Sequence, residues 1–466
     1  IGADKATGTI TNDMGVTAII SPAFPLTTGL KTVQVTLKNN GSNTITAANV
    51  KYTLNGGAAV TEPWSGSLAP CATTTFTFAT QVTIVPGANL LKVYTNSVNG
   101  NVPSADPNAA NDTAQFNLCA AMSGAYTINP AGAGATNFTT FAAAVSNLIC
   151  GGVNGPVTFT VSAGTYTENI SIPSINGSSS TNTITFNGTS AATCTLQNSV
   201  SSNGVVDLNG GDYITFTNMT ISNTSTAGYC VYFRNSADFN TINNCILNTP
   251  VGNSGAYSIY QNGTTDINNT ITNNTLNYGY GGIFIQSNTT TKSRRWTITG
   301  NTINNMYQYG AYLYYHDSIA FNSNNINGGS YITSSYGLYT AVLAGTININ
   351  KNKINLPNGG TYGMYLYANP ASTARGLVSN NFISIGGSMS TAYGMYVTST
   401  NYTDILNNSV NITDNVAGGS YALYWNSGQS FDTVRNNIFM NTGNGTSTGA
   451  GYASVSYTHL TLPTIL

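Results

Sequence analysis

The sequence predicts an all-β protein, a β-sandwich followed by a parallel β-helix (a solenoid of stacked rungs) with one capping helix. Three observations predict this fold class. The 466 residues are rich in Tyr (29) and Gly (49), and Tyr favours strands whereas Gly favours turns. Short alternating segments fill the first quarter of the chain, and an internal repeat fills most of the rest.

Composition also limits the function. Only 6% of the residues are charged and the net charge is −1, so the chain lacks the basic surface that a nucleic-acid partner requires. No apolar run approaches the ~18 residues of a transmembrane helix. His316 and His459 are the only histidines. We therefore predict no nucleic-acid partner, no transmembrane segment and no metal site.

Residues 14–119 have the pattern of a sandwich. Turn residues separate short alternating segments, which include residues 32–37, 50–54 and 75–78, and such spacing is typical of β-sandwiches. Four stretches resemble the CARDB-type Ig-like modules of bacterial adhesion proteins: residues 12–16, 35–41, 68–70 and 106–112. The resemblance implies a non-catalytic spacer or adhesion module. We assign residues 1–13 to the tail of a preceding region, and residues 120–136 to a linker and first strand.

A single helix is predicted after this linker. Apolar residues fall at helical spacing over residues 138–148, with Asn137 as the N-cap. The strand-forming segment 156–161 and the tripeptide Gly164-Thr165-Tyr166 follow. This order resembles the entry of pectin-lyase-like β-helices, whose end rung needs a cap. The resemblance implies a right-handed parallel β-helix over residues 137–454.

The repeat consists of two interleaved motifs. A tetrad of Tyr, a small residue, an apolar residue and Tyr recurs, for example at residues 336–339, 362–365 and 393–396. An Asn followed by any residue and an apolar residue alternates with it, at a mean spacing of about 28 residues. The Asn positions are Asn244, Asn274, Asn301, Asn324, Asn352, Asn381, Asn408 and Asn437. The shared period predicts about nine or ten rungs, with the Asn side chains forming a structural ladder at a bend.

Strand alternation assigns the tetrad to faces. In the rung at residues 362–366 it places Tyr362 and Met364 inside, and Gly363 and Tyr365 outside. The second Tyr of each tetrad then forms an outer column: Tyr232, Tyr260, Phe284, Tyr312, Tyr339, Tyr365, Tyr396 and Tyr424. Either the rings bind sugar faces, with Tyr312, Tyr339, Tyr365, Tyr396 and Tyr424 as the candidate ligand-binding residues, or they stack on one another. General stacking energetics favour the second interpretation.

Catalytic candidates are few. A patch of Asp266, Arg294, Arg295, His316 and Asp317 is the best enzyme hypothesis, because stacking of rungs would bring Arg295 near Asp317. Its four catalytic candidates are Asp266, Arg295, His316 and Asp317. A glycoside hydrolase needs two carboxylates about 5–10 Å apart. The paired-Asp, Gly-His-Gly and Arg-Ile-Lys signatures of polygalacturonases are absent, as are those of pectin methylesterases. The resemblance therefore implies the fold but supplies no catalytic residues. We predict no cofactor, with Ca²⁺ at an Asp- and Asn-rich edge as the alternative.

Two further features concern chain chemistry and ends. Six cysteines include no Cys-x-x-Cys pair; a disulfide between Cys119 and Cys150 is one pairing among several that the sequence leaves open. Residues 455–464 resemble one translated frame of a sequencing-library adaptor. We therefore expect residues 455–466 to be a non-native tail on a metagenomic fragment, and the natural protein to continue into further domains.

Together these observations favour an exported bacterial surface protein. It would act as an adhesin or structural stalk and contact a polysaccharide or cell-surface glycan through the outer Tyr column. The arrangement resembles Bacteroidetes-type surface proteins, which implies a secreted or cell-surface location in a Gram-negative bacterium. The alternative is a polysaccharide lyase or glycoside hydrolase of the pectin-lyase-like fold, and the missing signatures favour a non-enzyme.

Overall fold

A computed structural model gives the fold of the chain. The structure describes residues 11–23, 26–85, 87–100, 111–252, 255–329, 335–368, 375–387, 391–413 and 419–442, together with the backbone of residues 451–452. The expected tail at residues 455–466 lies outside the described residues, as do the first ten residues.

The chain divides into two compact units. The first contains residues 1–123, 133–136 and 146–155, and the second contains residues 124–132, 137–145 and 156–466. The sequence predicts that the sandwich region ends at residue 119 and that a linker with the first strand follows it. The solenoid sheets already include a strand that begins at Met122.

The first unit contains antiparallel sandwich sheets. One has the order β1 (Met14–Ser21), β3 (Gln34–Asn39), β6 (Thr73–Thr77), and a second has the order β5 (Val60–Leu68), β4 (Ile45–Leu54), β8 (Gly87–Asn96), β9 (Thr113–Ala120). A short pair joins β2 (Gly29–Lys31) to β7 (Val82–Ile84), and a 3₁₀ turn spans Val98–Gly100. Alternate residues of these strands face inward, as period-two alternation requires.

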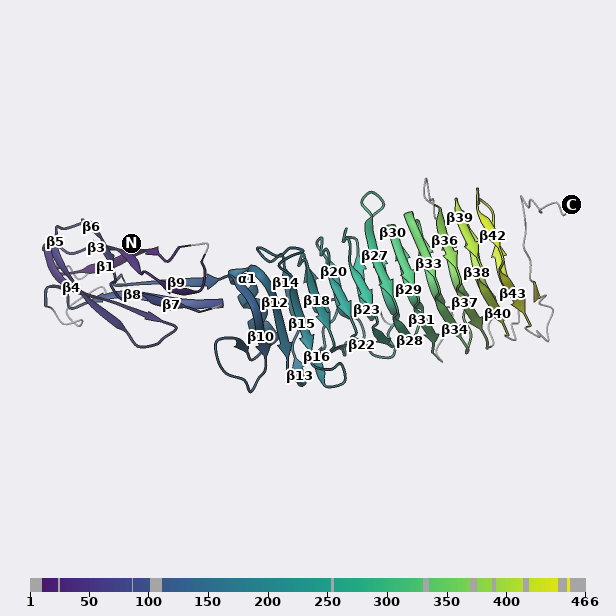
Figure 1. Cartoon of the computed structure of the whole chain (residues 1–466), viewed down its shortest axis with the longest axis horizontal. Helices are drawn as coiled ribbons and strands as arrows, with labels where there is room; N and C mark the ends of the chain where they lie inside the picture. Colours follow the sequence, from purple (N-terminus) through teal and green to yellow (C-terminus); the bar gives the residue numbers. More distant parts are fainter. Residues whose placement is uncertain are drawn as a thin grey trace, which may run out of the picture. The chain divides into compact units, whose positions relative to one another are not determined.

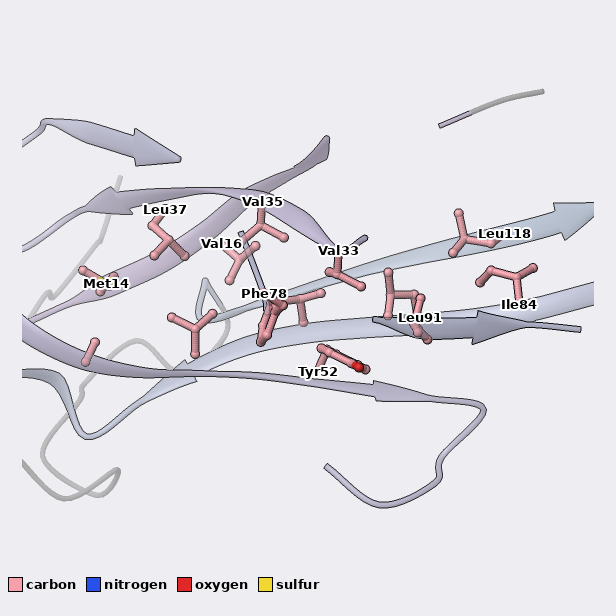
Figure 2. Packing of buried hydrophobic residues seen from close by; sticks show 14 of the residues in the cluster. Met14, Val16, Val33, Val35, Leu37, Tyr52, Phe78, Ile84, Leu91 and Leu118 are labelled. Atoms are coloured by element: carbon pink, nitrogen blue, oxygen red, sulfur yellow. The ribbon is translucent and has the colours of Figure 1, made fainter. Parts of the chain in front are cut away.

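The sandwich core is formed by those inward residues (Figure 2). Val35 and Leu37 of β3 and Leu91 of β8 are completely buried, and Phe78 is nearly so. The Phe78 ring meets Tyr52 edge to face, with ring centroids 4.8 Å apart. Burial of large apolar side chains between two sheets is the main stabilisation of such a unit.

The second unit is an all-β, right-handed parallel solenoid made of three sheets (Figure 1). Sheet 1 contains β11 (Asn137–Phe138), β10 (Met122–Ile128), β12 (Val153–Val161), β15 (Ile184–Gly188), β18 (Ile214–Thr217), β21 (Thr241–Asn243), β24 (Thr270–Thr272), β27 (Ser293–Thr299), β30 (His316–Asn322), β33 (Ala344–Asn350), β36 (Gly376–Ser379), β39 (Thr403–Leu406) and β42 (Thr433–Arg435).

Sheets 2 and 3 each contain eleven strands. Sheet 2 contains β13 (Gly164–Thr167), β16 (Cys194–Asn198), β19 (Thr220–Asn223), β22 (Ile246–Asn248), β25 (Thr275–Asn277), β28 (Thr302–Met306), β31 (Asn325–Gly328), β34 (Lys353–Leu356), β37 (Phe382–Ile385), β40 (Ser409–Ile412) and β43 (Ile438–Asn441). Sheet 3 contains β14 (Ile170–Pro173), β17 (Gly204–Asn209), β20 (Tyr229–Arg234), β23 (Tyr257–Asn262), β26 (Gly281–Gln286), β29 (Tyr309–Tyr314), β32 (Tyr336–Ala341), β35 (Tyr362–Tyr367), β38 (Ala392–Thr398), β41 (Ser420–Trp425) and β44 (Gly451–Tyr452).

Each solenoid rung contributes one strand to each sheet, and strands of successive rungs pair in parallel. The prediction of nine or ten rungs is slightly low, because the first rungs carry neither the Tyr tetrad nor the Asn motif. Their cores are formed instead by stacked Phe159, Phe186 and Phe216, whose ring centroids are 4.8 Å apart from one rung to the next.

The predicted helix exists but begins later than expected. Helix α1 spans Phe141–Gly151, whereas residues 137–138 form β11. Asn137 is therefore not the N-cap; its side chain bonds to Asn129 and Thr127. Thr140 Oγ1 accepts the amide of Ala143, and the carboxylate of Glu168 accepts the first two helical amides. A carboxylate at this end also opposes the positive end of the helix dipole.

A disulfide joins the sandwich strand β9 to helix α1. Cys119 and Cys150 are paired, with Cα atoms 5.5 Å apart. This was one of the pairings that the sequence left open. Cys194, Cys230 and Cys245 are buried free thiols, and Cys71 is exposed.

Candidate functional site

The outer face of sheet 3 carries a continuous column of aromatic rings. Tyr312, Tyr339 and Tyr365 are register partners in β29, β32 and β35, so their side chains lie directly above one another. From Tyr260 to Tyr424 the column's successive ring centroids are 4.6–5.1 Å apart and the ring planes differ by 3–19°. All rings in this column are half-buried. The rings therefore stack on one another, as the second sequence interpretation proposed.

A second aromatic column runs beside the first. It contains the first Tyr of each tetrad, namely Tyr309, Tyr336, Tyr362, Tyr393 and Tyr421, with centroids 4.7–5.3 Å apart. Within each of these rungs the two Tyr rings meet edge to face at 5.1–5.4 Å. The prediction that Tyr362 and its equivalents face inward is wrong, because these residues are half-buried and not in the core.

The small residue between the two Tyr positions explains the error. Gly363 is buried, not outward, and so is Met364 beside it, which means that the strand bends here and strict alternation does not apply. A Cβ on Gly363 would lie 2.4 Å from Ile383 Cγ2 and 2.5 Å from the carbonyl oxygen of Gly394. One rung earlier, a Cβ on Gly337 would meet the equivalent atoms, Ile354 Cγ2 and the Gly363 carbonyl oxygen. The glycine is needed for space at the bend, and it leaves Tyr on the outer side of the chain.

Ring stacking decides which atoms a ligand can reach. A ring inside the column has another ring against each face, so its edge and hydroxyl are the accessible parts. Burial raises the pKa of the Tyr312 and Tyr365 phenols above their usual value, so these hydroxyls stay neutral donors at neutral pH. The face presents rows of phenol hydroxyls at the strand spacing of ~4.8 Å.

An ion pair between the buried Asp207 and the partly exposed Arg234 lies at the first rung of the column, and the sequence analysis missed it. Asp207 is the register partner of Tyr232 and is 1% exposed. Arg234 binds it in two places, with Nε–Oδ1 at 2.7 Å and Nη2–Oδ2 at 2.6 Å. Ser171 donates to the same carboxylate, and the guanidinium lies 5.5 Å from the Tyr232 ring centroid. The signal that could have found it is Asp207 standing one rung before the first Tyr of the column.

The Asn motif forms a buried ladder at a bend between sheets 1 and 2. In each rung the backbone and side-chain amides donate to the Oδ1 atom of the next Asn, at 2.8–3.1 Å. This pattern runs without a break through Asn274, Asn301, Asn324, Asn352, Asn381, Asn408 and Asn437. Asn244 does not belong to it: the amide of Cys245 takes the ladder position, and Asn244 bonds outward to Asn218. Two adjacent asparagines precede Cys245, and the motif alone does not fix which residue stands at the bend.

The four catalytic candidates do not form an open patch. Asp266 is completely buried; it accepts the amide of Ala237 and the hydroxyl of Thr264, and burial raises its pKa. His316 is also completely buried, edge to face with Trp296, and burial lowers its pKa to about 3. Neither group is placed to touch a polysaccharide.

The other two candidates are accessible but lie apart in register. Arg295 is exposed and donates to Asn268. Asp317 is half-buried, accepts the Ser318 hydroxyl, and has Arg294, not Arg295, as its strand partner. Among the described residues, no group of three or more His, Cys, Asp and Glu could hold a metal ion. The Ca²⁺ edge stays a prediction.

The fold defines the class: a right-handed parallel β-solenoid protein. A family description, "Right handed beta helix region", matches residues 163–326 and 203–374, which together are less than half of the chain. No curated protein sequence matches the chain. No helix within the described ranges is long and apolar enough to cross a membrane.

Solved structures similar to the chain include enzymes and an adhesin. Pectin methylesterase PemA from Erwinia chrysanthemi is 10% identical, covers 56% of this chain and 79% of its own, and has a TM-score of 0.33. A lacto-N-biosidase from Eubacterium ramulus is 10% identical, with 70% and 68% covered and a TM-score of 0.38. The surface protein and adhesin PfbA from Streptococcus pneumoniae is 14% identical, with 66% and 93% covered and a TM-score of 0.31. At these values the likenesses carry no inference about function.

Proposed function

We propose that the chain is a stalk or adhesin segment of an exported bacterial surface protein, and that it contacts glycans through the aromatic face of sheet 3. In this proposal the sandwich unit is an Ig-like adhesion or spacer module. The natural protein is secreted or held at the surface of a Gram-negative cell.

The observation that carries the proposal is the pair of half-buried Tyr columns. Each ring is fixed by stacking within its column and by an edge-to-face contact within its rung. The hydroxyls are therefore held in rows with little conformational freedom left to lose on binding. A linear polysaccharide carries hydroxyls at regular intervals, and it could lie along these rows. Contact by ring edges and hydroxyls replaces the sugar-face stacking considered from the sequence.

The enzyme alternative has weaker support. Two of its four candidate residues, Asp266 and His316, are completely buried, and a general acid or base must reach the substrate. No observation on the described residues favours a lyase or hydrolase over a binding role.

The test uses a panel of polysaccharides that includes polygalacturonate and alginate, with and without Ca²⁺. The Tyr339→Phe/Tyr365→Phe double variant keeps both rings and removes both hydroxyls. Tyr402→Phe is the matched control, because Tyr402 stacks on Phe431 outside the two columns. We expect binding without cleavage, weakened in the double variant and unchanged in the control.

Three results would overturn parts of this proposal. New reducing ends or unsaturated products would establish an enzyme. Full binding by the double variant would exclude the hydroxyl rows. Absence of binding to every polysaccharide would leave a structural stalk.

A further inference from the structure

The outer face of sheet 1 carries a different array from that of sheet 3. Two outward positions per strand are occupied by Thr or Asn over most of the first eight rungs. From β12 to β33 the pairs are Thr158 and Thr160, Thr185 and Asn187, Thr215 and Thr217, Thr241 and Asn243, Thr270 and Thr272, Thr297 and Thr299, Ala320 and Asn322, and Asn348 and Asn350.

Strict register makes this a two-dimensional lattice. Thr215, Thr241 and Thr270 are successive strand partners, and Thr297 continues the column. A parallel column one pleat away contains Thr217, Asn243, Thr272 and Thr299. Positions repeat every ~4.8 Å across the strands and every ~6.6 Å along them, from the strand spacing and the rise of two residues.

The lattice is uncharged and stiff. None of its sixteen side chains is charged from β12 to β33; Arg294 lies at the start of β27, before the lattice positions, and Asp404 enters the first column only at β39. The residues between the two columns, such as Phe216, Ile271 and Ile298, are completely buried, which fixes the strands from below. Thr is branched at Cβ and has few rotamers, so each hydroxyl and methyl is held in place.

These properties select a ligand. A charged polymer would gain nothing from a neutral surface, and none of the sixteen positions carries an aromatic ring of the kind that the Tyr columns offer to a sugar. A regular array made mostly of Thr hydroxyl and methyl groups instead orders a layer of water, because hydroxyls anchor water and methyls shape the water around them. In ordinary ice, oxygen atoms repeat along two perpendicular directions at spacings close to the two spacings of this lattice.

We propose that the outer face of sheet 1 binds ice. The array from β12 to β33 would hold water molecules in positions that match the growing crystal surface, and the protein would adsorb there. This binding site is separate from the Tyr columns of sheet 3, so the two proposals can fail independently.

The experiment measures incorporation of the full chain into slowly growing ice and the difference between its melting and freezing temperatures. The test variant is Thr270→Tyr/Thr297→Tyr, which places two rings on the lattice. The control is Thr275→Tyr/Thr302→Tyr, which makes the same change in the same two rungs on the outer face of sheet 2. Circular dichroism of all three proteins checks that each is folded.

We expect the unchanged chain and the control to enter the ice and separate the two temperatures, and the test variant to lose both effects. Exclusion of the unchanged chain from ice would overturn the proposal. Equal behaviour of the two double variants would also overturn it, because the effect would then not belong to sheet 1. Binding to crystalline cellulose or chitin without any effect on ice would assign the face to a polysaccharide surface instead.

Discussion

The buried Asn ladder and the outer Tyr columns both hold successive rungs together, but through different interactions. Both place the same residue type above itself in successive rungs. The Asn ladder uses directional hydrogen bonds between buried side chains, whereas the Tyr columns use stacking at a half-buried surface. The Tyr column accepts Phe284 as a member, but from Asn274 to Asn437 the ladder accepts no other residue. Directional bonds in the interior specify a residue; ring stacking at the surface specifies only a shape.

The largest effect is expected from breaking the ladder. Asn352→Ala removes the acceptor of the Asn324 backbone and side-chain amides, and the donor to the Phe321 carbonyl. It also removes a donor to Asn381 Oδ1. Four buried polar groups lose a partner, so we expect the free energy of unfolding to fall by about 3 kcal/mol or more. Chemical denaturation measures it. Asn355→Ala, on the outer side of β34, is the control and should change stability by less than about 0.5 kcal/mol; equal losses would contradict the comparison.

The second-largest loss of stability is expected from a substitution at the bend between the two Tyr positions. Gly363→Ala forces a Cβ against Ile383 and the Gly394 carbonyl, and overpacking of this kind costs about 1–3 kcal/mol. Thermal unfolding of this variant is compared with Ala422→Gly. Ala422 occupies the equivalent position in β41, and removing its Cβ adds no contact. If the Gly363→Ala protein were as stable as the parent, the neighbouring rungs would have to accommodate the added Cβ without a loss of stability.

The Tyr columns should be more tolerant. Tyr365→Ala removes stacking on Tyr339 and Tyr396 and the edge contact with Tyr362. The two stacked pairs, at about 0.5–1.5 kcal/mol each, account for an expected loss of about 1–3 kcal/mol. Tyr365→Phe keeps all three contacts and should match the parent, as Phe284 does in its own rung. A large loss in the Phe variant would show that the hydroxyls, not the rings, stabilise the face.

At neutral pH the smallest effect is expected from His316, a buried polar side chain outside the Asn ladder. Neither ring nitrogen of His316 has a hydrogen-bond partner among the described residues, and burial lowers its pKa to about 3. Between about pH 6.5 and about pH 3 the unfolded state binds a proton that the folded state does not, so this group destabilises the fold as the pH falls.

His316→Leu should therefore reduce the loss of stability on acidification, measured as unfolding free energy across that pH window. Asp238, whose pKa burial raises to about 6, has the opposite sign. It is present in both proteins, so its contribution cancels in the difference. An unchanged pH slope in the Leu variant would mean that His316 is solvated or protonated in the folded state.

The sequence reveals the parts of the fold that repeat. The period identifies the rungs, and the spacing of Asn locates the bend from Asn274 onward. Prediction from the sequence is wrong where strand alternation does not hold. The bend at Gly363 breaks the alternation, so the first Tyr of the tetrad lies on the outer side. Prediction also fails where one residue type interrupts a column, as Asp207 does. A pattern along the chain does not show which residue lies above or below in the next rung. That residue determines both the side on which the first Tyr lies and the point at which Asp207 ends the Tyr column.

The candidate site was predictable only in outline. The outer column at Tyr312, Tyr339 and Tyr365 follows from the tetrad, but ring orientation depends on the rungs above and below. In the patch predicted around His316, two of the polar residues, Asp266 and His316, are completely buried. The expected stacking of rungs grouped these residues, but the sequence pattern did not separate the buried side chains from the exposed ones.

The Asn ladder also keeps the stacked strands in register independently of the length of the segments that connect them. One step of the ladder spans 23 residues, from Asn301 to Asn324, and another spans 29, from Asn352 to Asn381, with the same hydrogen bonds. The difference in length lies outside the strands of the two rungs. A turn can therefore be lengthened, shortened or exchanged while the stack keeps its register, so evolution or an engineer can add a new surface loop to any rung without redesigning its neighbours.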